Sequence, residues 1–140
     1  MTDLTHRVRV FVFGYRDGRP DYLLLRRDCN PESFWTPLHG RLGFDEQLES
    51  AVQREVHAGT GLSRLGEVID LRMTHDLLLG DEQVIEWTYA ARVFDTPEPE
   101  QLQATWAAHR WSDFEQAYQA LEFEVDRASI LRLHTLLRAA

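Results

Sequence analysis

The sequence predicts an α+β or α/β sandwich in which helices cover both faces of a mixed β-sheet. Apolar residues alternate in the N-terminal third, recur at helical spacing in the middle, and form strand-like runs before a helical C-terminus. This order of strands, helix, strands and helices is typical of a layered α/β/α architecture. The chain has 140 residues and no internal repeat or flexible linker, so we expect a single domain over residues 1–140.

The N-terminal segment predicts strands joined by tight turns. Val8, Val10 and Val12 lie on one face of an alternating run, which has the period of a strand. Asp17 and Gly18 form a turn signal before the next apolar run. The predicted strands are residues 7–15 and 21–27, followed by a short third strand at residues 34–35.

A loop containing Asn30 and Pro31 precedes this third strand. Cys29 lies in the same loop and is the only cysteine, so the chain cannot form an intrachain disulfide. We interpret Cys29 as a loop thiol rather than as a nucleophile.

Residues 45–58 predict an amphipathic helix. Leu48, Val52 and Val56 recur at helical spacing among Glu, Gln and Arg residues, so we expect these three side chains to be buried. The helix should end at the Gly59-Thr60-Gly61 segment, which is a helix-stop signal.

The second half of the chain predicts a long hairpin. Gly80 and Asp81 separate a strand over residues 65–79 from a strand over residues 84–94. Pro97 and Pro99 then interrupt the pattern.

The C-terminal segment predicts one short strand and two helices. The strand covers residues 107–111. Ser112 or Asp113 can cap a helix that runs towards Leu121, and Asp126 can cap the last helix.

Composition narrows the functional classes. The net charge is −8, from 15 basic and 23 acidic residues, which argues against binding to nucleic acid but allows a small phosphorylated substrate. No apolar run is long enough to cross a bilayer, so we expect no membrane association through a spanning helix. The N-terminus lacks the pattern of a signal peptide, so we expect a cytoplasmic protein.

One motif carries chemical information. Residues 34–62 read FWTPLHGRLGFDEQLESAVQREVHAGTGL. This segment resembles the Nudix box, whose pattern is G, five residues, E, seven residues, R-E-U-x-E-E-x-G-U, where U is aliphatic. The predicted strands and terminal helices are similar to the Nudix α/β/α sandwich over nearly the whole chain. The matching positions are Gly40, Glu46, Arg54, Glu55, Val56, Gly61 and Leu62.

Within this family, residues 35–40 (WTPLHG) look like the W-x-x-V-T-G segment of the dihydroneopterin-triphosphate and dATP pyrophosphohydrolases. The resemblance implies a pyrophosphohydrolase that cleaves a nucleoside diphosphate linked to another group (NDP-X), with Mg²⁺ or Mn²⁺ offsetting the phosphate charge. It assigns Glu55 and the backbone of Gly40 to the metal, and Glu46 and Arg54 to an orienting pair. Glu55, Arg54 and Glu46 are therefore the predicted catalytic residues.

The sequence departs from the family pattern at the metal ligands. Ala58 and Gly59 stand where the box has two adjacent Glu residues, and Thr105 stands where this branch has a further Glu. Mg²⁺ needs several hard oxygen ligands, so we expect weak binding of Mg²⁺ or Mn²⁺. Restoring Glu at positions 58 and 59 should then raise metal affinity and hydrolysis together.

Two functions therefore stay open. The first is an NDP-X pyrophosphohydrolase with a weakened or altered metal site. The second is a catalytically inactive Nudix-fold module that binds a nucleotide or another partner. A homodimer is also compatible with the sequence.

Three basic residues are candidates for substrate binding. Arg26 and Arg27 end the second strand and could meet phosphate, although a solvated strand end is the simpler interpretation. His39 lies where the chain enters the box and could face the pocket or be an ordinary loop histidine. His57 lies about 200° from Glu55 around a helix, so we expect it to point away from the site.

Some other residues near the box are weaker candidates for the site, because a chain with 23 acidic residues places some of them there by chance. The remaining carboxylates near the relevant segments are Asp45, Glu49, Glu98 and Glu100. The four tryptophans could stack on a base but are more often core residues; they are Trp35, Trp87, Trp106 and Trp111.

Overall fold

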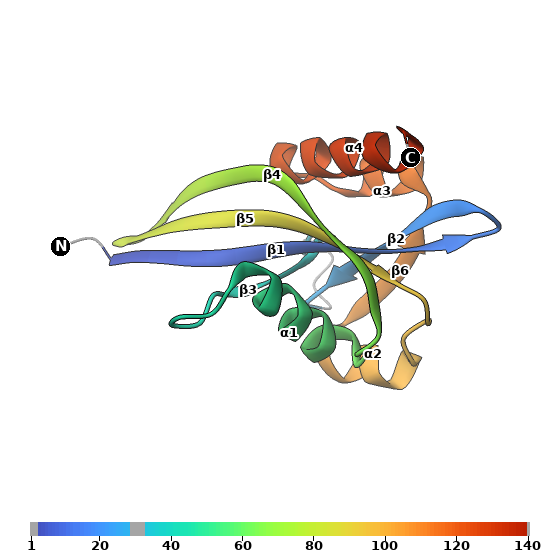
Figure 1. Ribbon diagram of the computed structural model, residues 1–140, viewed down its shortest axis with the longest axis horizontal. Coiled ribbons are helices and arrows are strands. Elements are labelled where there is room, and N and C mark those ends of the chain that lie inside the picture. The colour runs from blue at the N-terminus through green and yellow to red at the C-terminus, as the bar shows by residue number, and fades with distance from the viewer. Residues whose placement is uncertain (1–2, 29–32, 140) are drawn as a thin grey trace.

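The computed structural model describes residues 3–28 and 33–139. A mixed sheet lies between two helical layers, with α1 and α2 on one face and α3 and α4 on the other (Figure 1). The strands are β1 (Asp3–Arg16), β2 (Arg19–Arg26), β3 (Leu38–Arg41), β4 (Leu65–Leu79), β5 (Glu82–Val93) and β6 (Ala108–Ser112). The helices are α1 (Leu48–Thr60), α2 (Pro99–Thr105), α3 (Phe114–Ala120) and α4 (Glu124–Ala139). The predicted α/β/α sandwich is confirmed.

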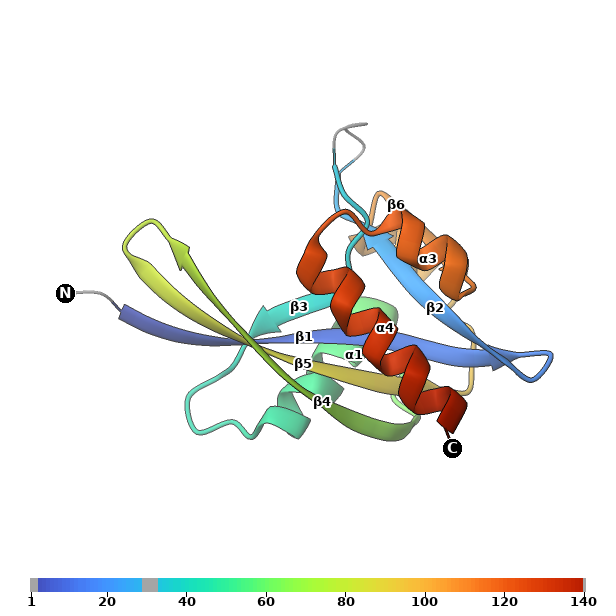
Figure 2. The same ribbon diagram turned by 90° about the horizontal axis from the view of Figure 1, so that it is seen from above.

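Strand β1 organises the sheet. The strand order is β4-β5-β1-β2-β6, and β3 pairs with β1 beside this path. β1 runs parallel to β5 and antiparallel to both β2 and β3. The middle of β1 pairs with β3, with Arg7 opposite Arg41 and Arg9 opposite His39. The tip of the β4–β5 hairpin lies beside the N-terminal end of β1 (Figure 2).

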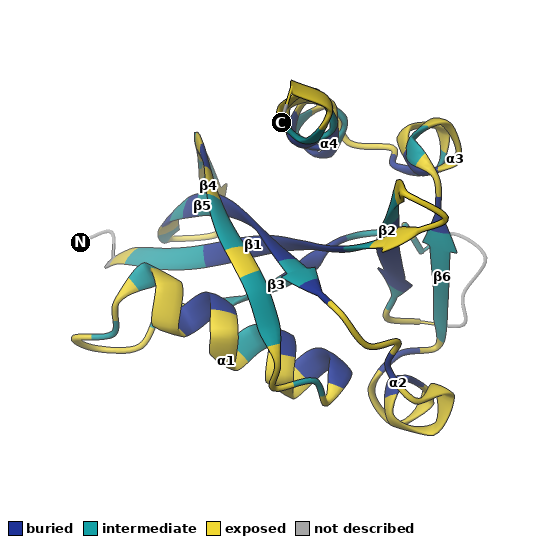
Figure 3. Cartoon of the chain, turned by 45° about the vertical axis from the view of Figure 1, so that its right-hand side comes forward, coloured by how far each residue is buried: buried dark blue, intermediate teal, exposed yellow. Residues whose placement is uncertain are grey.

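The alternation along β1 builds a separate core on each face of the sheet. Val8 and Val10 pack with Val52 of α1, whereas Phe11 and Phe13 belong to the cluster that packs under α3 and α4. Figure 3 shows buried residues along the central strands and exposed residues along the outer faces of the helices. The period-two pattern therefore fixes which side chains of β1 face each helical layer.

The predicted helix over residues 45–58 is confirmed with shifted ends, because α1 spans Leu48–Thr60. Asp45 has a φ of 58°, which is the left-handed conformation, so the helix begins after it. Gly61 has a φ of 78° and terminates the helix. On the predicted apolar face, Val52 and Val56 are buried and Leu48 is partly buried.

Two local predictions need correction. The described chain has no strand at residues 34–35; Thr36 instead forms a single bridge to Leu25, and β3 begins after Pro37. Helix α2 was not predicted, since Pro97 and Pro99 looked only like breakers. Pro99 is the first residue of α2, where the missing N–H and fixed φ of proline favour a helix start.

The two predicted helix caps have different outcomes. Asp113 caps α3, because its side chain accepts a hydrogen bond from the Gln116 N–H at 2.9 Å. Asp126 lies inside α4, which begins at Glu124, so the prediction that it caps this helix is wrong. Its carboxylate is buried against Arg9 instead.

Cys29, Asn30 and Pro31 lie outside the described residues, so the prediction of a loop thiol is not tested. Among the residues that the structure describes, no helix is long and apolar enough to span a membrane.

Candidate functional site

A guanidinium–carboxylate pair joins the loop and the helix of the box. Arg54 donates from Nε and Nη2 to the two carboxylate oxygens of Glu46, both at 2.9 Å. Glu46 also accepts from the Gly43 N–H, and Arg54 donates to the Arg41 carbonyl at 2.7 Å. The bond from Arg54, with a smaller effect of the Gly43 N–H, lowers the pKa of Glu46 to about 2. These contacts hold the loop before α1 against the helix.

Glu55 follows Arg54 and faces the backbone of Gly40 in β3. Arg54 Nη1 donates to Glu55 Oε1 at 2.6 Å. A Cβ built at Gly40 would lie 1.9 Å from Glu55 Oε1, so only glycine leaves room for the carboxylate where it lies. The structure thus brings Glu46, Arg54, Glu55 and Gly40 together, while their catalytic and metal-binding roles stay predictions.

An apolar side chain fills the position of one missing carboxylate. Gly59 is buried, and a Cβ built there would lie 2.5 Å from Leu38 Cδ2. Leu38 is 2% exposed and packs in the same cluster as Val52 and Val56. A carboxylate at position 59 would therefore have to displace part of this core. The box pattern alone does not reveal that Leu38 and Gly59 fit each other.

Trp106 closes the same end of α1. Its side chain is buried, and Nε1 donates to the Gly59 carbonyl at 3.0 Å. Thr105, the expected location of a further carboxylate ligand, is the exposed last residue of α2. The C-terminal turn of α1 is thus packed against apolar and aromatic groups.

The described residues were compared with the ligand set that a divalent cation needs. Across residues 3–28 and 33–139, no group of three or more His, Cys, Asp or Glu side chains is placed to hold a metal ion. Glu55 is paired with Arg54, and Ala58 is exposed to solvent. One paired carboxylate is far fewer ligands than Mg²⁺ requires. The other carboxylates considered from the sequence are all exposed; they are Asp45, Glu49, Glu98 and Glu100.

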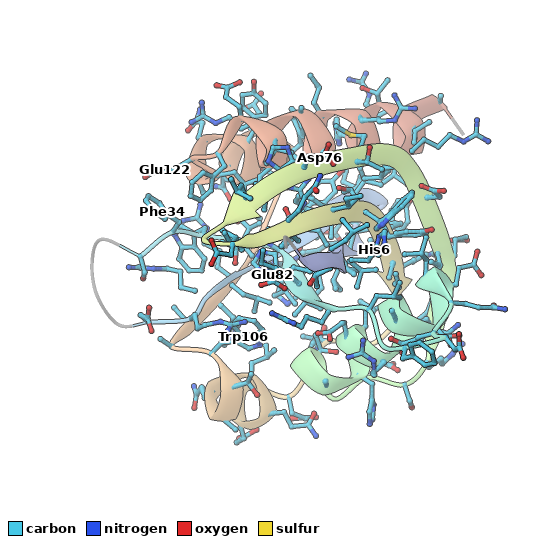
Figure 4. All side chains as sticks on the ribbon, turned by 90° about the vertical axis from the view of Figure 1, so that its left-hand side faces the viewer. His6, Phe34, Asp76, Glu82, Trp106 and Glu122 are labelled. Atoms are coloured by element: carbon cyan, nitrogen blue, oxygen red, sulfur yellow. The ribbon has the colours of Figure 1, made fainter. Side chains whose placement is uncertain are left out.

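A cavity of about 320 Å³, which we call the cationic pocket, lies beside β3. Side chains alternate along a strand, so His39 and Arg41 project from the face opposite to that of Leu38 and Gly40. Figure 4 faces this end of the molecule, with Glu82 at the start of β5. The residues that line the cationic pocket are Arg7, Arg27, His39, Gly40, Arg41, Leu79, Glu82 and Val84.

The cationic pocket has a positive balance of charge. Glu82 pairs with Arg41 at 3.0 Å and accepts a hydrogen bond from Thr5. In the part of the chain that the structure describes, neither Arg7 nor Arg27 forms an ion pair. The pKa of His39 falls to about 4, mainly through burial and further through the nearby arginines. His39 is therefore uncharged at neutral pH and leaves the guanidinium groups as the cations of the pocket.

The predicted substrate-binding residues do not all lie together. Arg27 and His39 line the cationic pocket, but Arg26 is not among its lining residues. The Arg26 guanidinium lies 5.3 Å from the centre of the Trp35 ring. Sequence reasoning missed Arg7 and Arg41, which the pairing of β1 with β3 places opposite each other.

Other expectations about individual side chains can be compared with the structure. His57 is exposed, as predicted from its angle around the helix. Trp106 is buried in the core as expected, whereas the other three tryptophans are only partly buried. Trp87 donates from Nε1 to His6 Nδ1 at 3.1 Å.

The sequence profile described as the NUDIX domain matches residues 5–134. The chain therefore belongs to the Nudix family, as the box predicted. A search of curated proteins found no match.

Solved structures share the fold over most of the chain. A C. elegans Ap4A hydrolase binary complex has a TM-score of 0.73 at 16% identity, covering 97% of this chain and 99% of that chain. The NUDIX domain of Shewanella oneidensis NrtR, complexed with ADP ribose, has a TM-score of 0.73 at 19% identity, with coverage of 98% and 90%. The E. coli dihydroneopterin triphosphate pyrophosphohydrolase has a TM-score of 0.70 at 17% identity, with coverage of 89% and 91%. These likenesses establish the fold.

The Glu46–Arg54 pair predicts an acid-dependent loss of stability. Folding lowers the Glu46 pKa from 4.5 to about 2, so its contribution is present above about pH 4.5 and is lost as pH falls towards about 2. We expect Arg54→Ala to lower the Tm at neutral pH and to flatten this part of the pH profile. Thermal unfolding across this range measures both effects, with the exposed neighbour Gln53→Ala as control. A double-mutant cycle with Glu46→Ala that shows no coupling would contradict the prediction.

Proposed function

We propose that this chain binds a small diphosphate-linked (NDP-X) molecule in the cationic pocket and hydrolyses it weakly at most. The observation that carries this proposal is the contrast between two regions on opposite faces of β3. An arginine-lined cavity suits phosphate oxygens, because guanidinium groups form paired, charge-assisted hydrogen bonds with them. The end of α1, by contrast, is packed by Leu38 and Trp106 where cation ligands would be needed.

The similar structures support a phosphorylated ligand. One of them is complexed with ADP ribose, and the other two are named as hydrolases of Ap4A and of dihydroneopterin triphosphate. Arg27 and His39 are the proposed substrate-binding residues that line the pocket. Arg26 would contribute through its position at the end of β2.

A pyrophosphohydrolase with a weakened or altered metal site is the second candidate. The retained arrangement of Glu46, Arg54 and Glu55 on Gly40 favours it. Glu55 would then be the catalytic carboxylate, and Arg54 and Glu46 would orient it. Mg²⁺ or Mn²⁺ would bind weakly, since Glu55 is the single box carboxylate that remains at the metal positions.

The test is a panel of ADP-ribose, Ap4A, dATP and dihydroneopterin triphosphate. Calorimetry measures binding, and chromatography measures cleavage in EDTA, Mg²⁺ or Mn²⁺. We expect binding of at least one compound, with turnover well below about 1 per second. Turnover at or above that rate would favour the second candidate, and an absence of binding to every compound would refute the proposal.

Glu55→Gln distinguishes the two candidates. It preserves the size of the side chain but removes its charge, so ligand binding in the cationic pocket should change by less than about threefold. Any residual cleavage should fall by about 10² or more if Glu55 acts as an acid–base group. The exposed change Glu49→Gln is the matched control. Cleavage that is unaffected by Glu55→Gln would remove Glu55 from the catalytic assignment.

We further propose that residues 1–140 act as a single domain in the cytoplasm and do not bind nucleic acid. The acidic net charge of −8 supports the last point. Light scattering distinguishes a monomer from a homodimer, and cell fractionation tests the compartment.

A further inference from the structure

We propose that the arginines of the cationic pocket, and not a divalent cation, neutralise the diphosphate part of the ligand, so that this chain binds it without a metal ion. This inference rests on the proposed function, because it concerns how the same pocket neutralises the ligand. A diphosphate carries several negative charges, and a site that cannot hold a cation must offset them with protein groups. The described residues lack the cation site but supply the positive charge.

The arrangement of Arg7 and Arg41 favours an anion between them. These residues stand opposite each other on β1 and β3. Like charges directly opposite each other on paired strands are destabilising. Arg7 is partly buried and forms no ion pair in the described part of the chain. A bound phosphate group would relieve the repulsion and supply acceptors for both guanidinium groups.

Arg27 brings positive charge towards the end of α1. Its guanidinium carbon lies 5.5 Å from the centre of the Trp106 ring, and Trp106 donates to the carbonyl of Gly59. The aromatic ring therefore connects Arg27 to the turn of α1 where the family pattern has carboxylates.

Glu82 is the internal competitor of the ligand. Its carboxylate pairs with Arg41 and accepts a hydrogen bond from Thr5, and Glu82 lines the same cavity. An incoming phosphate would compete with Glu82 for Arg41. Neutralising Glu82 should therefore tighten binding of an anion, an effect that a purely structural role for these residues would not produce.

Two further carboxylates lie near the pocket arginines. Glu86 is the neighbour of Arg7 on β5 and is 6% exposed, but no ion pair joins these two residues in the described part of the chain. The charge of Arg9 also lowers the pKa of His39. This charge is offset by the carboxylate of Asp126, which lies 2.9 Å from the Arg9 guanidinium. Arg7 and Arg27 remain as the cations without an ion pair among the described residues, so they are the residues to test.

The experiment measures binding of inorganic pyrophosphate and of the bound panel compound to the full chain, in EDTA and in excess Mg²⁺. We expect pyrophosphate affinity in EDTA to be at least equal to that in Mg²⁺. Arg7→Gln and Arg27→Gln should each weaken binding in EDTA by about tenfold, as expected for loss of a hydrogen bond between charged groups. Glu82→Gln should tighten it, and Arg132→Gln, an exposed change on α4, should leave it unchanged.

Each outcome decides the inference. Binding that requires Mg²⁺ overturns it while leaving the proposed function intact, because the panel compound still binds. Equal affinity for wild type, Arg7→Gln and Arg27→Gln also overturns it. Arg27 is exposed, so Arg27→Gln remains informative even if Arg7→Gln impairs folding. Absence of binding for every compound, with and without Mg²⁺, refutes both the inference and the proposed function.

Discussion

Replacing Asp126 by alanine is expected to destabilise the protein by about 3 to 5 kcal/mol, the usual result of leaving one partner of a buried ion pair. Asp126 Oδ1 lies 2.9 Å from Arg9 Nη1, and the two side chains are 5% and 3% exposed. Arg9 also donates to Ser129 at 2.6 Å and to Thr88 at 3.0 Å. These neutral partners do not offset the charge of a guanidinium that water cannot reach.

Two control variants separate lost charge from lost packing. Asp126→Asn keeps an acceptor for Arg9, so its loss of stability should be smaller than that of Asp126→Ala. The paired change Arg9→Met with Asp126→Leu removes both charges and should recover most of the stability. Urea unfolding measures the free energy of each variant. An alanine variant within about 1 kcal/mol of wild type would show that Arg9 does not depend on this carboxylate.

The same pair predicts a second pH dependence. Burial raises the pKa of Asp126 from 3.8 to about 6, with Arg9 opposing the shift. Because the folded pKa is the higher one, the folded state holds this proton more tightly, and stability falls as pH rises from about 3.8 through about 6. The ion pair with Arg9 offsets only part of the cost of burying the ionised carboxylate. The wild type should therefore lose stability relative to Asp126→Asn across this interval. Parallel pH profiles of the two proteins would contradict the prediction.

Local sequence patterns predicted most of the fold because they report on elements that bury one face. The alternation at Val8, Val10 and Val12 correctly predicted β1, and the spacing of Val52 and Val56 correctly predicted α1. The local pattern assigned the wrong role to Asp126. A residue that resembles a helix cap can instead form an ion pair with a buried charge that is far away in the sequence. Nothing near Asp126 in the sequence identifies Arg9 as its partner.

The residues of the candidate site likewise fall into those that the sequence could predict and those that it could not. Glu46, Arg54 and Glu55 lie within one loop–helix segment, so their spacing predicted that they would meet. Arg7 and Arg41 come from separate strands, and only the register of β1 with β3 brings them together. Sequence alternation could have placed Arg7 on a face, but it could not identify the strand beside it.

Introducing Glu at both positions 58 and 59 is expected to destabilise the protein and to leave metal binding unimproved, contrary to the expectation from the sequence alone. A Cβ at position 59 meets Leu38 Cδ2 at 2.5 Å, and overpacking of a filled core costs about 1–3 kcal/mol. Burying the carboxylate beside Leu38 adds a further penalty, because a charged group without a partner is costly in apolar surroundings. Ala58→Glu alone is the control, because position 58 is exposed and should tolerate the change.

Adding Leu38→Ala to the double variant tests the physical cause. Leu38→Ala alone should cost about 2–5 kcal/mol through the cavity it leaves. If positions 38 and 59 share one volume, the two changes should cost less together than the sum of their separate costs, which a double-mutant cycle measures. The triple variant then has space for the carboxylates beside Glu55, and its affinity for Mn²⁺ should exceed that of both the wild type and the double variant. A double variant that is as stable as wild type and already binds Mn²⁺ would show that Leu38 yields readily, and that the missing carboxylates alone weaken the site.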